Sequence, residues 1–150
     1  MTEKKAKEVI DSFEQVAKLL QVRPALPTGI LPSYIKLIDC IYQLSKEGIV
    51  KVSDIATAFN QTRPSITRSL LAMDNLKLVK KVPSKEDKRV VYVSLTSKGL
   101  KLYDKYIDSY YKQLTKRLSK YDSNEINQMI NLINDIYHDL EKNPIQIKGE

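Results

Sequence analysis

Two short segments of this sequence concentrate side chains that carry positive charge or donate hydrogen bonds. The first segment, residues 62–68, combines two guanidinium groups with three hydroxyl groups. Guanidinium and hydroxyl groups bind phosphate oxygens, and arginine also pairs with the major-groove edge of guanine. The candidate contact residues of this segment are Thr62, Arg63, Pro64, Ser65, Thr67 and Arg68. Their chemistry suits a nucleic acid, and a solvated helix face is the plainer interpretation of the same residues.

The second segment, residues 85–89, carries three cations and two acids. A carboxylate two residues before an arginine can hold the guanidinium by a charge-assisted hydrogen bond, so Asp87 is expected to orient Arg89. An oriented arginine suits a narrow minor groove, where the negative potential is enhanced. Taken alone, an ordinary surface ion pair would be the better interpretation of these two residues. The candidate DNA-contacting residues here are Lys85, Lys88 and Arg89.

The net charge of +7 is concentrated in the part of the chain that holds both segments. Residues 51–98 carry ten basic and four acidic side chains, which is +6 of the total. Residues 1–50 are close to balance at +1, and residues 99–150 are neutral. A localised basic excess is typical of proteins that sit on phosphates, although charge alone can also serve solubility.

Hydrophobic periodicity places the first segment at the start of a helix that belongs to a helix-turn-helix. Ser33 is expected to cap a helix over 34–47, and Ser53 to cap a short helix after it. Thr62 is expected to cap the next helix, with Pro64 in its first turn. The apolar residues Ile66, Leu70 and Met73 follow at helical spacing, so one stripe should face the core and the polar residues a partner.

The second segment is expected at the tip of a β-hairpin. Residues 79–82 and 90–95 read as two strands with a polar tip between them, and a hairpin directly after a helix-turn-helix is a wing. Thr96 can then cap a helix that runs to about residue 119, and residues 122–125 resemble a capping box for a last helix. The predicted fold is mainly α with a small β-hairpin wing.

The predicted domains follow from this order of elements. Residues 33–99 form a winged helix-turn-helix DNA-binding domain, and residues 1–32 with 100–150 form a helical dimerisation region. The dimerisation region includes amphipathic helices, expected over 3–22 and to about residue 141, whose apolar stripes would be exposed in a monomer.

The wing and the helix-turn-helix together resemble the MarR family of bacterial transcriptional regulators. Residues 87–89 read Asp-Lys-Arg and residues 95–99 read Leu-Thr-Ser-Lys-Gly, which match the family's wing motif position for position. Residues 55–56 and 64–68 resemble the family's helix-turn-helix. The resemblance covers about residues 3–141.

Two positions depart from the family pattern after the helix that Thr62 is expected to cap. Lys77 stands where the family usually has glycine, which indicates strain or a different helix cap at the exit. Lys81 stands where the family usually has arginine. The positive charge is kept, but lysine cannot donate the two parallel hydrogen bonds of a guanidinium group. These departures concern local geometry and leave the class unchanged.

The resemblance implies a homodimer that binds an inverted-repeat operator in double-stranded DNA, most simply as a repressor. It also implies control by a small aromatic or phenolic effector held between the dimerisation helices and the winged domain, or else by oxidation of a cysteine. Tyr34, Tyr106 and Tyr110 are candidate lining residues, and ordinary core or interface tyrosines are an equally good interpretation. Cys40, the single cysteine, most simply packs as a small apolar side chain.

Other classes of function fit the sequence less well. An enzyme is not expected, because the chain has no Gly-rich phosphate loop, no plausible metal cluster and no recognisable nucleophile–base set. No metal or other cofactor is expected either. A winged helix used for protein contact remains the alternative, because a fold does not determine a function. The charged start of the chain, the lone cysteine and the lack of a long apolar run predict a cytoplasmic protein without a membrane partner.

Overall fold

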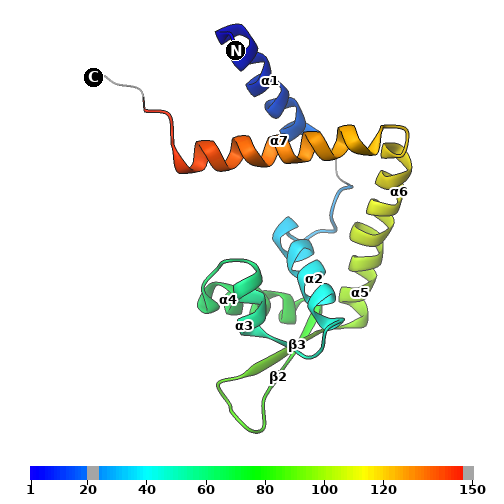
Figure 1. Ribbon diagram of the computed structural model, residues 1–150. Coiled ribbons are helices and arrows are strands. Elements are labelled where there is room, and N and C mark those ends of the chain that lie inside the picture. Colours follow the sequence, from blue (N-terminus) through cyan, green and yellow to red (C-terminus); the bar gives the residue numbers. More distant parts are fainter. Residues whose placement is uncertain (20–23, 147–150) are drawn as a thin grey trace. The chain divides into compact units, whose positions relative to one another are not determined.

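The structure of the protein is a computed structural model in which residues 1–19 and 24–146 are described (Figure 1). The chain divides into two compact units, residues 1–108 and residues 109–150. The elements of the first unit are α1 (Glu3–Leu19), α2 (Pro32–Ser45), β1 (Val50–Lys51), α3 (Val52–Ala58), α4 (Arg63–Asn75), β2 (Val79–Pro83), β3 (Val91–Leu95), α5 (Ser97–Tyr103) and the π-helical η2 (Asp104–Asp108). Those of the second unit are α6 (Ser109–Leu118) and α7 (Ser123–Lys142). This composition confirms the predicted fold class.

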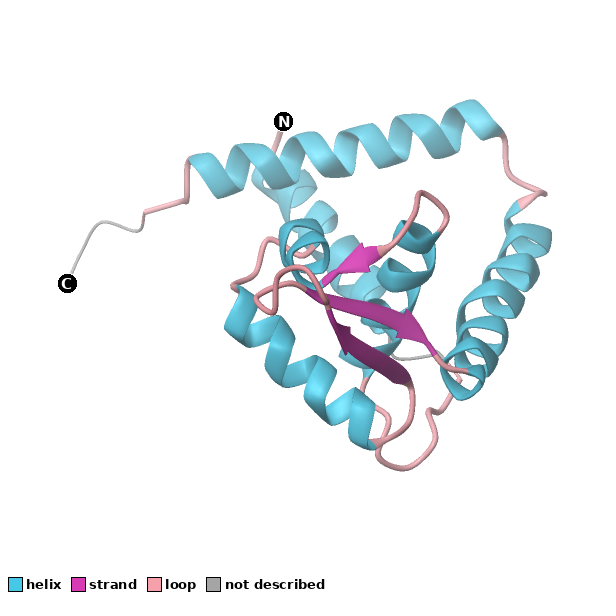
Figure 2. Cartoon of the chain, turned by 90° about the horizontal axis from the view of Figure 1, so that it is seen from below, coloured by secondary structure: helices cyan, strands magenta, loops and turns pink. Residues whose placement is uncertain are grey.

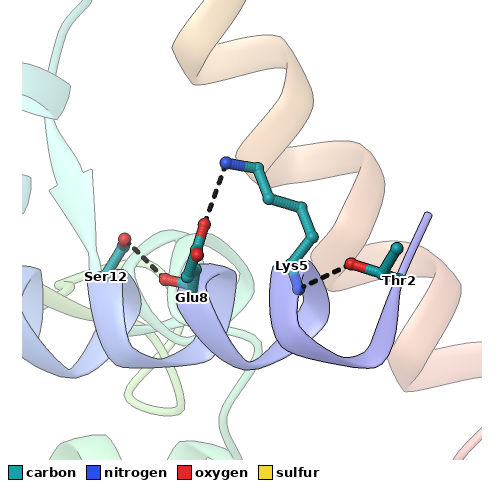
Figure 3. A network of polar contacts seen from close by, with 4 residues as sticks. All are labelled: Thr2, Lys5, Glu8 and Ser12. Carbon is teal, nitrogen blue, oxygen red and sulfur yellow. Dashed lines mark hydrogen bonds and ion pairs between the residues drawn. The ribbon is translucent and has the colours of Figure 1, made fainter.

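The first helix, α1, is stabilised by polar contacts within its own sequence (Figure 3). The Thr2 hydroxyl accepts the backbone N–H of Lys5 at 3.2 Å and so caps the helix. Lys5 also pairs with Glu8 at 3.0 Å, and the Ser12 hydroxyl donates to the Glu8 carbonyl at 2.7 Å. The described helix ends at Leu19, so the last residues of the helix predicted over 3–22 lie outside the described part of the chain.

The start of α2 differs from the prediction. Ser33 is not the cap, because the helix begins at Pro32 with Leu31 as N-cap and without a side-chain hydrogen bond. Proline is favourable at the first helical position, since the N–H that it lacks would have no partner within the helix.

The start of α3 also differs, and the physical reason is a carboxylate. Ser53 lies inside the helix, which begins at Val52. The Asp54 carboxylate accepts the Lys51 backbone N–H at 2.9 Å, as the acidic member of a capping box does. A charged acceptor at the helix start is also favoured by the helix dipole.

The core of the first unit forms where α2, α3 and α4 pack against one another and against the sheet. The predicted stripe of Ile66, Leu70 and Met73 is confirmed, because none of the three is more than 1% exposed. Because the core takes only this stripe of α4, the opposite face of the helix remains exposed. The other fully buried large side chains are Ile38, Ile41, Ile55, Leu78 and Val79.

The sheet has three antiparallel strands in the order β1-β3-β2 (Figure 2). β2 and β3 form the predicted hairpin, in which Val79 lies opposite Leu95 and Pro83 opposite Val91. β1 was not predicted, since two residues are too few to show a strand's alternation. It pairs Val50 with Val93 and thereby joins the chain before α3 to the middle of β3.

The exit of α4 is a left-handed turn at Lys77, whose φ is 60°. The Lys77 N–H donates to the Asp74 carbonyl and the Leu78 N–H to the Met73 carbonyl, both at 2.9 Å. This pair of bonds is a Schellman motif, in which the Lys77 position usually holds glycine. The turn that the family pattern implies is therefore kept, and lysine adopts it at a cost of about 1 kcal/mol.

The residues directly after this turn fasten the end of α4 to the start of α5, and we call this contact the α4–α5 joint. The Leu78 carbonyl accepts the Thr96 backbone N–H at 3.0 Å, and the Thr96 hydroxyl donates to the Lys77 carbonyl at 2.5 Å. The same hydroxyl accepts the Gly99 N–H at 3.1 Å, which confirms the predicted Thr96 cap. Gly99 is required here because a Cβ at this position would overlap the Leu78 carbonyl oxygen.

The long helix predicted to follow Thr96 is interrupted by a π-helical segment, η2. The buried side chains of this stretch are Tyr103 and Ile107, and Tyr103 stacks on Tyr42 of α2 with ring centroids 3.7 Å apart. A π segment adds a residue to a helical turn without any change in residue type, which is why the pattern does not predict it.

The second unit contains α6 and α7. The Asp122 carboxylate accepts the N–H groups of Asn124 and Glu125 at 2.8 and 3.1 Å, which confirms the predicted start of α7. Large apolar side chains of α7 remain exposed within the unit, among them Met129, Ile130, Tyr137 and Leu140. In the described residues no helix is both long enough and apolar enough to cross a membrane.

Replacing Lys77 by glycine is expected to stabilise the protein by about 0.5–1 kcal/mol, because glycine adopts the left-handed turn without a Cβ penalty. The measurement is the free energy of unfolding from urea titrations followed by circular dichroism. Lys80→Gly is the matched control: it also removes a lysine charge but lies within β2, where glycine should destabilise. A Lys77→Gly variant no more stable than the wild type would contradict the strain assigned to this turn.

Gly99→Ala is expected to destabilise the protein by roughly 1–3 kcal/mol or more, because the backbone at the α4–α5 joint must move to admit a methyl group. The same urea titration measures the change. Ser97→Ala, at an exposed position in the same helix, should stay within about 0.5 kcal/mol of the wild type. Unchanged stability of Gly99→Ala would mean that α5 can move away from α4 at no cost.

Candidate nucleic-acid interface

The first turn of α4 presents the first predicted segment to solvent. Thr62 is the N-cap, as predicted, and its hydroxyl accepts the Ser65 backbone N–H at 3.4 Å. Because Ile66 and Leu70 occupy the core, the opposite face of the helix points outward. The exposed residues of this turn and the next are Arg63, Pro64, Ser65, Thr67 and Arg68.

The start of α4 carries positive charge without a neighbouring acid. Its first turn contains Arg63 and no aspartate or glutamate. The helix dipole already places partial positive charge at this end, so an arginine there is unfavourable until an anion binds. Neither Arg63 nor Arg68 forms an ion pair within the described part of the chain. The turn is therefore electrostatically prepared for a phosphate.

The tip of the β2–β3 hairpin is organised by Ser84, which is 6% exposed. Its hydroxyl accepts the N–H groups of Glu86 and Asp87 at 3.2 and 3.4 Å. Its backbone N–H donates to the Val90 carbonyl at 2.8 Å and closes the loop. These bonds hold the loop in shape while its three cationic side chains, Lys85, Lys88 and Arg89, are exposed.

Asp87 contacts Arg89 at two points. One carboxylate oxygen, Oδ1, accepts the Arg89 backbone N–H at 2.9 Å and lies 3.5 Å from the guanidinium Nε. The Arg89 side chain is 94% exposed, so this ion pair contributes little to stability. What the contact provides is direction, since it holds the backbone turn from which the guanidinium extends into solvent.

A groove of about 420 Å³ lies between α4 and the hairpin. Arg63 and Thr67 line it from α4, and Arg89 lines it from the wing. Across the groove, Lys81 Nζ lies 3.7 Å from Asp74 Oδ2, so an ion pair joins β2 to α4. The lysine that replaces the family's arginine at position 81 is thus used to hold the two walls together. The structure brings members of both predicted segments to one surface.

The three tyrosines that were candidates for lining an effector cleft lie in different surroundings. Tyr34, in α2, and Tyr106, in η2, are partly buried in the first unit. The Tyr106 hydroxyl donates to the Ala25 carbonyl at 3.4 Å, which connects η2 to the segment before α2. Tyr110 lies in α6 and packs edge-on against Tyr111, with ring centroids 5.4 Å apart.

The Cys40 thiol is partly buried against the apolar core. Burial raises the pKa of this thiol, and the neighbouring Asp39 carboxylate raises it further. A raised pKa keeps the sulfur protonated at neutral pH, whereas a peroxide sensor needs a thiolate beside positive charge. The surroundings of Cys40 therefore favour its interpretation as a packing residue.

Sequence reasoning overlooked Gln61, the exposed residue before the α4 cap. Its side-chain oxygen accepts the Ser65 hydroxyl at 3.4 Å, so it belongs to the same polar surface. A glutamine amide can pair with the major-groove edge of adenine. The position of Gln61 directly before the predicted Thr62 cap could have identified it as a candidate contact residue. Ser84 was overlooked because its role depends on the loop's folded shape.

Within the described residues, no cluster of His, Cys, Asp and Glu side chains could hold a metal ion.

Comparison with known sequences agrees with this geometry. A family model described as a winged helix DNA-binding domain matches residues 37–99, from α2 to the start of α5. The HTH-type transcriptional regulator FarR of Neisseria gonorrhoeae is 34% identical over 92 residues, which are 57% of this chain and 63% of that protein. The chain thus matches less than two thirds of the length of this curated relative.

Solved structures match over nearly the whole chain. The MepR–DNA complex of S. aureus has a TM-score of 0.62 at 20% identity and covers 93% of this chain and 99% of that one. FabT of Streptococcus pneumoniae with DNA has a TM-score of 0.68 at 22% identity, and the match covers 94% of this chain and 99% of FabT. PcaV of Streptomyces coelicolor with its natural ligand has a TM-score of 0.61 at 15% identity, and the match covers 87% of this chain and 89% of PcaV. Residues 37–99 therefore match the model of a winged helix DNA-binding domain, and the chain as a whole has the fold of the MepR, FabT and PcaV structures.

Proposed function

We propose that this protein is a sequence-specific regulator of transcription that binds double-stranded DNA, most simply as a repressor. The observation that carries the proposal is the groove between α4 and the wing, which Arg63 and Arg89 line from opposite walls. The charge agrees, because residues 51–98 hold +6 of the chain's +7. FarR, MepR and FabT, which resemble this chain, are a transcriptional regulator and two proteins solved with DNA.

In this proposal α4 enters the major groove and the wing reaches the neighbouring minor groove. The cap and the first two turns of α4 supply phosphate and base contacts through Thr62, Arg63, Pro64, Ser65, Thr67 and Arg68. Lys85 and Lys88 at the wing tip contact phosphates, which position the protein without reading sequence. Arg89 enters the minor groove, and Asp87 fixes the turn that aims it.

The proposed assembly is a homodimer on an inverted-repeat operator. Residues 1–32 and 100–150 form the dimerisation region, and residues 33–99 contact DNA. The support is the set of large apolar side chains that each of these helices exposes, Ile10 and Val16 in α1 and Met129 and Ile130 in α7. A two-fold dimer presents the same α4 twice, so its operator repeats in inverted orientation.

A small aromatic or phenolic effector is the proposed signal, with Tyr34, Tyr106 and Tyr110 as candidate contacts. PcaV, which has the same fold, was solved with its natural ligand. An effector that binds only one spacing of the two α4 helices would shift the dimer toward or away from DNA. We propose no cofactor and no catalytic role, and we place the protein in the cytoplasm with its DNA.

A winged helix that contacts only proteins is the alternative function. The concentration of cations on the wing and α4 favours DNA binding over this alternative, since a localised basic surface is typical of nucleic-acid-binding proteins. The two functions differ in salt dependence, because release of counterions from DNA makes binding fall steeply as salt rises.

Removing Arg68 or Arg89 is expected to weaken DNA binding by different routes. Arg89→Ala should lose most affinity on operators with A/T-rich flanks, where a narrow minor groove attracts the guanidinium. Arg68→Ala should lose about 1–3 kcal/mol of discrimination at one base pair per half-site if it reads a base. If Arg68 binds phosphate, affinity should fall equally on all sequences. The measurement is a titration of each variant against operator, flank-swapped operator and random DNA at several salt concentrations.

Arg117→Ala is the matched control for these variants, because it removes an exposed arginine from α6. It should leave the order of affinities among the three DNAs unchanged. Both test side chains are exposed, so thermal melting of the variants should match the wild type. Wild-type affinity of Arg89→Ala for all three DNAs would mean that the wing does not touch DNA.

The purified chain is expected to sediment as a stable dimer at micromolar concentration, because two copies can cover each other's apolar stripes. Met129→Asp with Ile130→Asp should shift it toward monomer, since both are large exposed apolar residues of α7. Leu71→Asp, which adds a charge at an exposed apolar position of α4, is the matched control and should remain dimeric. A wild-type chain that sediments as a monomer would refute the proposed assembly.

A further inference from the structure

One large apolar side chain lies exposed on the polar face of α4. Leu71 is 52% exposed, whereas its neighbour Leu70 is completely buried. Single exposed leucines are common on protein surfaces and need no special explanation. The position of Leu71 is different, because the helix that carries it is the one whose surface is proposed to meet DNA.

Helical geometry places Leu71 within the candidate contact surface. Successive residues of an α-helix turn by about 100°, so Leu71 lies about 40° from Thr67 and about 60° from Arg68. It lies about 140° from Ile66, whose side chain points into the core. Thr67 and Asp74, on either side of it along the helix, both line the groove toward the wing. Leu71 therefore stands between that groove and the outward-facing Arg68.

The chemistry of the major groove limits what a leucine can contact there. Most base-edge atoms in that groove are hydrogen-bond donors or acceptors, and a leucine can satisfy none of them. The exception is the 5-methyl group of thymine, which is the apolar feature that distinguishes one base edge from the others. A leucine placed against a methyl group gains from the removal of both apolar surfaces from water.

We infer that Leu71 is a specificity-determining residue that contacts the 5-methyl group of one thymine in each operator half-site. This inference rests on the proposed DNA-binding function. It assigns the reading of one base to an apolar contact rather than to the arginines and hydroxyls of the same helix.

Deoxyuridine tests the contact, because it differs from thymidine only by the missing methyl group. The full-length protein is first used to select its operator from random duplexes. Each thymine pair related by the operator's symmetry is then replaced by deoxyuridine, and dissociation constants are measured. For the wild type, one replacement should weaken binding by about fourfold per half-site, the factor expected from burial of one methyl group.

The decisive comparison is with Leu71→Ala on the same DNAs. This variant should bind the thymine operator more weakly than the wild type, and the sensitive deoxyuridine replacement should then cost it nothing further. Leu71→Met keeps an apolar contact and should recover the methyl sensitivity. Arg68→Ala is the matched control, because it removes a neighbouring contact and should retain the sensitivity at that thymine.

The outcomes separate this inference from the function on which it rests. Failure of the wild type to select any operator would overturn the proposed function itself. A selected operator without a methyl-sensitive thymine, or equal sensitivity in the wild type and Leu71→Ala, would overturn only the role of Leu71. Because Leu71 is exposed, the variants should melt at the wild-type temperature, which confirms that the comparison is made between folded proteins.

Discussion

The close approach of α5 to the end of α4 is the constraint on which the rest of the first unit depends. Gly99 lies against the Leu78 carbonyl with no room for a Cβ. The Thr96 hydroxyl donates to the carbonyls of Lys77 and Leu78, the residues that follow α4. The Lys98 ammonium adds a third bond, to the Leu76 carbonyl at 2.9 Å. β2 begins directly after this joint and β3 ends directly before it. One contact thus sets the direction of α4, the base of the wing and the start of α5.

This arrangement explains how the candidate interface can be both exposed and rigid. Its cationic side chains make few contacts of their own, and Arg89 is almost fully exposed. The backbone beneath them is held by the α4 core stripe, by the Ser84 bonds in the wing and by the Lys81–Asp74 ion pair. Because the scaffold is already ordered, less conformational entropy is lost when a partner binds. The exposure of the cationic side chains keeps their charges available to a polyanion.

The features that the sequence predicted correctly are those encoded by spacing. The Ile66, Leu70 and Met73 stripe, the Thr62, Thr96 and Asp122 caps and the hairpin all follow from periodicity and residue type. The misplaced caps at Ser33 and Ser53 show where residue type is insufficient, because a nearby proline or carboxylate moved the boundary. β1, η2 and the role of Ser84 depend on neighbours distant in the chain or on backbone geometry, which local patterns do not contain.

The pairing of β1 with β3 has a consequence for how the domain opens. These strands close a loop of chain, residues 52–90, that contains α3, α4 and β2. α4 lies within that loop, so its opening is expected to be coupled to separation of the sheet. We expect the helix and the sheet to form one cooperative unit in native-state hydrogen exchange, with the wing tip beyond Ser84 as a separate unit. Evolution can therefore lengthen or recharge the tip without loosening the helix beside it.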